Sequence, residues 1–118
     1  MSYDGWIMLR VSEDDAHELE DVGNYTSNVS PMWTHALTEA MGGTRTPLSA
    51  TEGWSCERAA PVLAQALAVM ERDADALRAL EPSNGWGDYA GALKYLGRVS
   101  ALCDRFSKVD GAYLHWWV

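Results

Sequence analysis

Near the start of the chain, apolar and polar residues alternate with a period of two. In residues 6–11 (Trp-Ile-Met-Leu-Arg-Val), the three aliphatic residues at odd positions share one face of an extended segment. Turn-forming residues follow at positions 12–15, and a second, more polar strand is predicted over residues 17–22. The pattern therefore predicts an N-terminal antiparallel hairpin.

Farther along, apolar residues recur every three to four positions, which is typical of amphipathic helices. Ser30 looks like an N-cap, Pro31 suits the first helical position, and the Gly-Gly pair at 42–43 is a favourable helix end. A second helix is predicted to begin within residues 57–61. Its proline should lie near the first turn, because a deeper proline would break the hydrogen-bond ladder.

The most regular apolar pattern covers residues 89–107 and predicts the longest helix, for which Asp88 is a favourable N-cap. Asp73 is expected to cap a shorter helix before it. After a turn, the aromatic-rich residues 112–118 are predicted to form a closing strand that pairs with residues 6–11.

Together these elements predict an α+β fold. A small antiparallel sheet, made of the N-terminal hairpin and the C-terminal strand, would pack against three or four helices. The 118 residues lie within the usual size of one domain, and 47% of them are hydrophobic, so the chain can bury its own core. We therefore expect a single compact domain over residues 1–118.

An uncharged polar segment precedes the first predicted helix. We call it the polar run; its members are Asn24, Tyr25, Thr26, Ser27 and Asn28. Their amides and hydroxyls can donate and accept hydrogen bonds, so the polar run suits a recognition loop. A well-capped turn explains the same residues equally well.

Three predicted loop regions carry a tryptophan beside polar or flexible residues: Trp33, Trp54 and Trp86. Tryptophan offers a rigid apolar face with a polar tip, which suits a binding site. If these loops gather at one end of the helices, they form an aromatic-walled pocket in which Arg45 meets an anionic ligand. The predicted site comprises Asn24, Tyr25, Thr26, Ser27, Asn28, Trp33, Arg45, Trp86, Asp88 and Tyr89. The alternative is that the three tryptophans fill the core beneath their loops.

The formal net charge is −8, and most of it lies in the first half of the chain. Lys and Arg are few and scattered, so direct binding to nucleic-acid phosphates is not expected. Within the predicted hairpin, the nine positions 13–21 hold six acids and no lysine or arginine: Glu13, Asp14, Asp15, Glu18, Glu20 and Asp21. This acidic cluster is either a solubilising turn or a surface that docks on a basic host protein.

No motif for a metal, a cofactor or a nucleophile stands out. The three histidines lie on separate predicted elements without ligand spacing, so neither a metal site nor a cofactor is expected. A small hydrolase that uses Asp88 and a histidine stays open as an alternative.

Several features favour a cytosolic protein. No apolar run is long enough to span a membrane, and the N-terminus lacks the pattern of a signal peptide. Cys56 and Cys103 are expected to be reduced thiols, with a bridge between them as the open alternative.

Two segments resemble sequences from a group of small uncharacterised proteins encoded by tailed bacteriophages. They are Asn24-Tyr25-Thr26-Ser27-Asn28-Val29-Ser30 with Met32-Trp33, and Asn84-Gly85-Trp86-Gly87-Asp88-Tyr89 with Gly91-Ala92-Leu93. The order of the segments, after an Asp-Gly-Trp-Ile opening at residues 4–7, also fits. The resemblance implies an accessory protein in the cytoplasm of an infected bacterium, and it assigns no activity to individual residues.

Taken together, the sequence favours a non-enzymatic accessory protein. We expect it to bind and sequester a small, nucleotide-like ligand of host defence. The first alternative is an acidic inhibitor that binds a basic surface of a host protein, and the second is the small hydrolase. The partner is thus a small molecule or a host protein, and whether the chain forms a homo-oligomer stays open.

Overall fold

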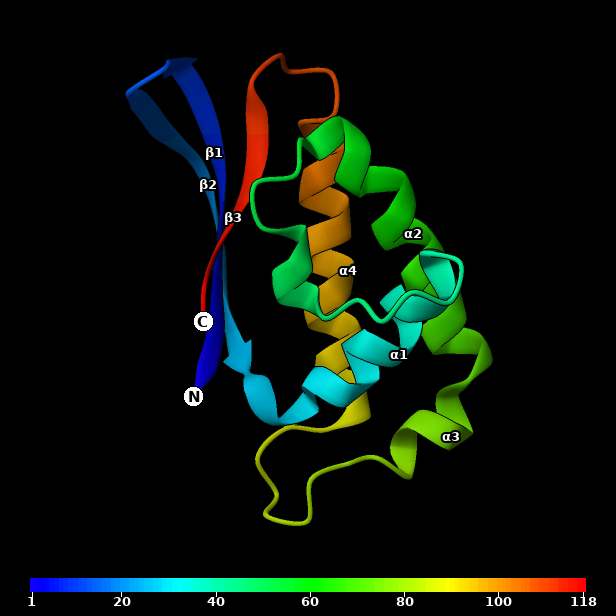
Figure 1. Cartoon of the computed structure of the whole chain (residues 1–118). Helices are drawn as coiled ribbons and strands as arrows, with labels where there is room; N and C mark the ends of the chain where they lie inside the picture. Colours follow the sequence, from blue (N-terminus) through cyan, green and yellow to red (C-terminus); the bar gives the residue numbers. More distant parts are fainter.

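A computed structural model describes all 118 residues, in which a three-stranded sheet and four α-helices form two layers (Figure 1). The elements in chain order are β1 (Ser2–Ser12), β2 (Asp15–Thr26), α1 (Ser30–Ala40), α2 (Cys56–Arg72), α3 (Ala74–Arg78), α4 (Tyr89–Arg105) and β3 (Ala112–Trp117). Short 3₁₀ turns cover Ser27–Val29 and Leu48–Thr51. The helices all lie on one side of the sheet, which confirms the predicted α+β architecture.

The sheet is antiparallel, with β1 at its centre and the strand order β2-β1-β3. β1 pairs with β3 from Asp4 opposite Trp117 to Leu9 opposite Ala112, as the sequence predicts. This pairing brings the two ends of the chain together at one end of the sheet (Figure 1).

The hairpin is longer than predicted, and the polar run is not a free loop. Its first three residues close β2, where Tyr25 pairs with Tyr3 and Thr26 with Ser2. The run then turns, because the Thr26 hydroxyl accepts the N–H of Asn28 at 3.3 Å. A polar composition suggested a loop, yet an edge strand tolerates polar side chains wherever its backbone is paired.

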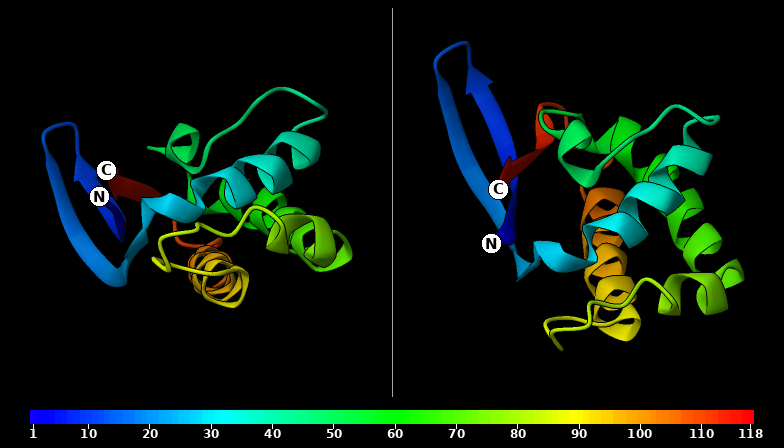
Figure 2. Two further views of the ribbon diagram at one scale, coloured as in Figure 1. Left: turned by 90° about the horizontal axis from the view of Figure 1, so that it is seen from below. Right: turned by 60° about the horizontal axis from the view of Figure 1, so that its bottom comes forward.

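The apolar face of β1 is buried only where helices cover it. Ile7 is fully buried and Leu9 half-buried, whereas Val11 is 49% exposed. The tip of the β1–β2 hairpin extends beyond the helices (Figure 2). Val11 is therefore exposed to solvent, although it was expected to share one face with Ile7 and Leu9.

The ends of α1 correct one expectation and confirm another. Ser30 is the first helical residue and makes no side-chain cap, because the 3₁₀ turn at Ser27–Val29 leads directly into the helix. Pro31 does lie in the first turn. The helix ends at a Gly-Gly pair with positive φ, and the Gly43 N–H donates to the carbonyl of Thr38 at 2.8 Å.

The other helices differ in how they begin. α2 starts at Cys56, capped by the Ser55 hydroxyl, so Pro61 lies one turn deeper than expected and removes one N–H from the ladder. Asp73 precedes α3 but makes no cap, because Arg72 and His35 engage its carboxylate. Asp88 caps α4 as predicted.

The core lies between the inner face of the sheet and α1, α2 and α4. An aromatic cluster crosses it, in which Tyr3 meets Trp33 and Trp116 edge-on, with ring centroids 5.3 and 5.5 Å apart. Cys56 and Cys103 are buried free thiols, so the alternative of a bridge is not realised. None of the helices combines the length and apolarity needed to cross a membrane.

Candidate functional site: a groove between β2 and α4

The two segments that stood out in the sequence meet in the structure. We call residues 84–88 the Gly-Trp-Gly loop. The N–H of Asp88 donates to the hydroxyl oxygen of Tyr25 at 3.2 Å. Gly87 has φ +94°, and a Cβ on it would lie 2.5 Å from the Thr26 Cγ2 atom, so glycine is required here. The end of β2 and the start of α4 therefore form one unit.

Beside this unit, an open groove of about 760 Å³ runs between β2 and α4. This volume lies within the usual range of ligand pockets. We call it the β2–α4 groove; its lining is Val22, Gly23, Asn24, Tyr25, Gly91, Lys94, Tyr95, Arg98, Ala101 and Leu102. The lining is mainly apolar, with amide, phenol and cationic groups among the apolar side chains.

The floor of the groove is aromatic and firmly held. The rings of Tyr25 and Tyr95 stack with centroids 6.1 Å apart and planes inclined by 22°. The Tyr95 hydroxyl lies 2.9 Å from the carbonyl oxygen of Gly23, and its ring also packs on the buried Trp33. Burial, and then the charges of nearby carboxylates, raises the pKa of Tyr95, so this phenol stays neutral.

Two cations border this floor. Arg98 donates from Nε to the carbonyl of Val22 at 2.7 Å and from Nη2 to that of Asp21 at 2.9 Å. Neither Arg98 nor Lys94 forms an ion pair with a carboxylate. In a chain with a net charge of −8, these two cations lie beside an aromatic surface without a carboxylate partner.

The cap of α4 positions the groove. The Asp88 carboxylate accepts the N–H of Gly91 at 2.7 Å, which fixes the first turn of the helix. A Cβ on Gly91 would lie 1.9 Å from the Tyr25 hydroxyl oxygen, so only glycine allows the helix to approach the ring this closely. Asp88 thus acts on the groove through the helix, not as a group in the groove lining.

Other predicted site residues surround the groove without lining it. Trp86 is 67% exposed, on a loop held by the bond from its N–H to the Asn84 side chain at 2.9 Å. The Ser27 hydroxyl donates to the carbonyl of Met1, and Asn28 is exposed. Thr26 is half-buried against the Gly-Trp-Gly loop.

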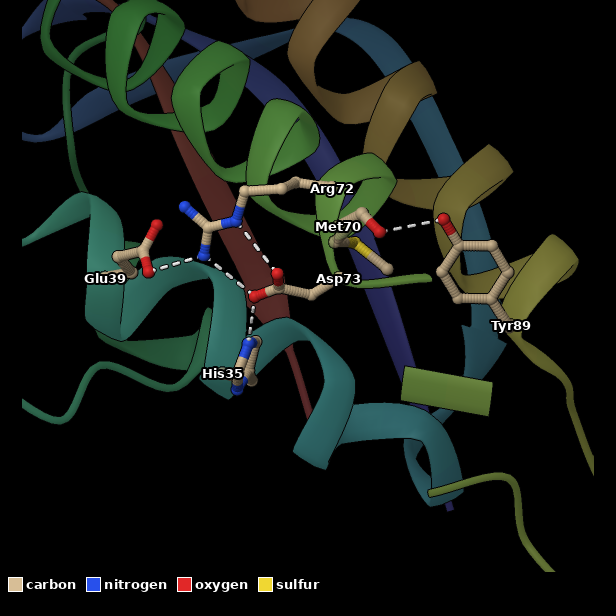
Figure 3. Close-up of polar contacts among 6 residues, drawn as sticks. All are labelled: His35, Glu39, Met70, Arg72, Asp73 and Tyr89. Carbon is tan, nitrogen blue, oxygen red and sulfur yellow. Dashed lines mark hydrogen bonds and ion pairs between the residues drawn. The ribbon is translucent and has the colours of Figure 1, made fainter. Parts of the chain in front are cut away.

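Trp33 and Tyr89 belong to the core. The Trp33 side chain is fully buried, and its Nε1 donates to the carbonyl of Ala92 at 3.0 Å. The Tyr89 hydroxyl donates to the carbonyl of Met70 at 2.8 Å (Figure 3). These two residues therefore support the neighbouring elements and do not form walls of a surface site. Trp54, which was grouped with Trp33 and Trp86 in the sequence, is half-buried with the Arg58 guanidinium 3.7 Å from its ring centroid.

Arg45 lies elsewhere. It lines a separate hollow of about 450 Å³ along α1, together with His35 and two threonines. Arg45 and the β2–α4 groove therefore do not form one pocket, and the two cations that the structure places at the groove are different residues.

A network of ionisable side chains joins α1 to the end of α2. His35 Nε2 lies 2.8 Å from the Asp73 carboxylate, which Arg72 also holds through Nε and Nη2 at 2.8 and 2.9 Å (Figure 3). Arg72 reaches Glu39 as well, at 2.6 Å. Arg72, and secondly His35, keeps the pKa of Asp73 well below its usual range.

Sequence patterns did not indicate this network, because its two halves, on α1 and at the end of α2, lie more than thirty residues apart in the chain and meet only in the fold. Its geometry ties two helices together. The other histidine–carboxylate pair is His115 with Glu52, at 3.0 Å. Neither pair includes Asp88, so the structure does not assemble Asp88 with a histidine as the hydrolase alternative assumed.

The acidic cluster follows the hairpin as predicted. Glu20 lies 3.8 Å from Arg105 of α4, whereas the acids of the turn have no cationic partner. These turn acids are Glu13, Asp14 and Asp15.

Most of the groove residues that sequence reasoning missed lie on α4, and the other two, Val22 and Gly23, lie on β2. Gly91, Lys94 and Arg98 recur at three and four positions, which places them on a single face of α4. This spacing is the sequence signal that could have indicated the α4 side of the groove, but any solvent-facing side of a helix shows the same spacing. No family model, curated protein or solved structure matches this chain.

Proposed function

We propose that this chain is a non-enzymatic binding protein that holds a small, nucleotide-like ligand in the β2–α4 groove. The observation that carries the proposal is an aromatic floor bordered by Lys94 and Arg98, neither of which pairs with a carboxylate. A planar ring gains stacking energy from the aromatic floor, and an anionic group gains from the two cations.

The surroundings of the groove support the same class of ligand. Arg98 keeps donors beyond its two backbone bonds, and those bonds hold the guanidinium in place before a ligand arrives. The exposed Trp86 stands on the adjoining loop, where its indole can cover a bound ring.

The resemblance to small proteins of tailed bacteriophages suggests the setting. In this proposal the protein acts in the cytoplasm of an infected bacterium, where it sequesters a nucleotide-like molecule of host defence, one ligand per site. Sequestration requires affinity and a pre-formed site, and it does not require a catalytic group.

Native mass spectrometry tests this proposal. Protein purified gently from bacteria is compared with the same sample after unfolding and refolding. We expect a discrete extra mass that is lost on refolding. Trp86→Ala should lower its occupancy, because loss of a stacking side chain weakens binding by about 10-fold. Trp117→Ala, which removes a similarly exposed tryptophan that does not line the groove, should retain it.

The acidic hairpin supports a second candidate function, an inhibitor that docks on a basic host protein. Its turn acids have no cationic partner, and the hairpin extends beyond the helical layer (Figure 2). A bare chain in the mass spectrum would favour this candidate. Equal extra mass in the Trp86→Ala variant would count against the groove as the binding site.

A further inference from the structure

The two cysteines of the chain take no part in the β2–α4 groove or in the Asp73 network. Both side chains are fully buried and carry free thiols. Cys56 is the first residue of α2, and Cys103 lies near the end of α4. Because they are far apart in the sequence, only the packing of α2 on α4 can bring them together.

The contacts between α2 and α4 define how the two helices are aligned. They run in opposite directions, with the start of α2 beside the end of α4 (Figure 1). The hydroxyl of Tyr89, at the start of α4, donates to the carbonyl of Met70, near the end of α2, at 2.8 Å. The same number of residues, about four helical turns, leads back along α2 from Met70 to Cys56 and forward along α4 from Tyr89 to Cys103. The two cysteines therefore lie at the same level of the helix pair.

The surroundings allow the two thiols to touch. Their neighbours on the buried faces are small, with Ala59 and Ala60 on α2 and Ser100 on α4. Small side chains let two helices approach closely, which a disulfide requires because it spans only about 4.4–6.8 Å between Cα atoms. The Cys103 thiol donates a hydrogen bond to the Cys56 sulfur. This contact lowers the pKa of Cys56, and together with burial it raises the pKa of Cys103.

Cys56 is the better nucleophile of the pair. The thiolate is the reactive form, and the N–H groups in the first turn of α2 favour its negative charge. A hollow of about 220 Å³ lies at this helix start, lined by Ser55 and Glu57 on either side of Cys56 in the chain. Its other wall is the turn after α4, residues 107–112. A small oxidant can therefore approach the helix start, and fraying of the first turn exposes the thiol.

We propose that Cys56 and Cys103 form a redox-sensitive modification site, at which a peroxide converts the two thiols into a disulfide within one chain. The Cys56 thiolate attacks one oxygen of hydrogen peroxide, the O–O bond breaks, and a sulfenic acid and hydroxide form. The hydroxide takes the proton that Cys56 released and becomes water. The Cys103 thiol then loses its proton, and its sulfur attacks the Cys56 sulfur. The S–O bond breaks, and the departing hydroxide takes that proton.

The reaction balances as two thiols and one hydrogen peroxide giving one disulfide and two waters. The two sulfur atoms together lose two electrons, which the peroxide gains. A dithiol such as dithiothreitol reverses the change by thiol–disulfide exchange.

The disulfide joins α2 to α4 by a covalent bond where packing alone holds them in the reduced protein. A cross-link that closes a long loop stabilises a protein, chiefly by restricting its unfolded chain. Ala101 and Leu102 of the β2–α4 groove directly precede Cys103, so the bond also fixes the end of the groove wall on α4. Formation of the bond does not depend on any ligand in the groove.

Peptide mapping by mass spectrometry tests the proposal on the full chain. Reduced protein is treated with excess hydrogen peroxide in the absence of denaturant, and the remaining thiols are blocked before digestion. We expect a cross-linked pair of peptides that contain Cys56 and Cys103, from monomeric protein, and its loss after dithiothreitol. Oxidation should raise the Tm by at least about 5 °C, and reduction should reverse this rise.

Single variants test the order of attack. In Cys103→Ala, the remaining Cys56 should form a sulfenic acid that dimedone traps. In Cys56→Ala, the remaining Cys103 should be labelled at least about 10-fold more slowly, because its thiol is buried and ionises less readily. Circular dichroism establishes that both variants fold. Equal labelling of the two variants would overturn the assigned order.

The cross-link itself is measured in the unmodified protein, so this result stands even if a variant fails to fold. Two free thiols after peroxide treatment of the folded protein would overturn the proposal. A disulfide that joins two chains, or one that forms only in denaturant, would do the same.

Discussion

Gly91 and Gly97 lie on the same helix, but only Gly91 touches another element. A Cβ at Gly91 would overlap Tyr25, whereas a Cβ at Gly97 meets nothing within 4 Å. Gly91→Ala should therefore lower the free energy of unfolding by about 1–3 kcal/mol. Gly97→Ala should raise it by about 0.5–1 kcal/mol, because alanine favours a helix. Urea unfolding at equilibrium measures both.

The opposite signs of these two changes are the informative result. If Gly91→Ala stabilised the protein as Gly97→Ala does, then α4 would not approach Tyr25 as closely as described. The wall of the β2–α4 groove would then be misplaced.

At the scale of single residues, the sequence indicated which residue types suit a binding site better than it indicated where those residues lie in the fold. Tyr25 was expected in a binding site because of its polar neighbours, and it does line the groove. Trp33 has the same kind of neighbours, yet it is fully buried. Local composition cannot distinguish the two, because burial depends on which distant element packs above each residue.

At the scale of elements, Asp73 joins the end of α2 to α1. Contacts with Arg72 and His35 lower its pKa, so its ionised form is favoured in the folded state. This stabilisation is present above the ordinary value of 3.8 and is lost as the pH falls below it. Asp73→Asn should therefore be less stable than the unmodified protein at pH 7, and the difference should shrink in acid.

Asp75→Asn is the matched control for this prediction. Asp75 is an exposed acid on α3 whose closest cation is Arg78 at 3.6 Å. Thermal unfolding is measured from pH 7 to pH 3. The Tm of Asp73→Asn should lie below that of the unmodified protein at pH 7, and this difference should shrink as the pH falls. Asp75→Asn should show no comparable difference in Tm. High salt should reduce the Tm difference between Asp73→Asn and the unmodified protein, because the network is open to solvent. A Tm difference for Asp73→Asn that stays constant from pH 7 to pH 3 would contradict a stabilising role of the ionised Asp73 carboxylate.

Elements with strong periodicity were predictable from sequence. The long helix behind Asp88 and the closing strand both form where expected. The less predictable parts were boundaries decided by tertiary pairing. β2 continues into the polar run because β1 begins early enough to pair with it, and α1 needs no Ser30 cap because a 3₁₀ turn leads into it.

At the scale of the whole molecule, the charge distribution separates the proposed surfaces. The turn of the acidic hairpin lies at one end of the sheet, and the β2–α4 groove holds two cations without carboxylate partners. The sequence predicted the acidic hairpin directly from its run of acids. It could not predict the groove, whose two walls lie some 70 residues apart in the chain and meet only in the fold.

The measurement that tests the central claim most directly is a titration of ¹⁵N-labelled protein with nucleoside 5′-monophosphates, followed by amide chemical shifts. We expect the shifts to concentrate in the β2–α4 groove, at residues that include Asn24, Tyr25, Lys94 and Arg98. Lys94→Gln should weaken binding by about 10-fold at low salt. Lys108→Gln, an identical charge change outside the groove, should leave it unchanged.

Replacement of Glu13, Asp14 and Asp15 by serine should leave the position of these shifts unchanged, because the hairpin turn does not line the groove. Shifts in the groove that depend on Lys94 and not on Lys108 would support the account. No shift at millimolar nucleotide, or shifts centred on the hollow beside Arg45, would contradict it.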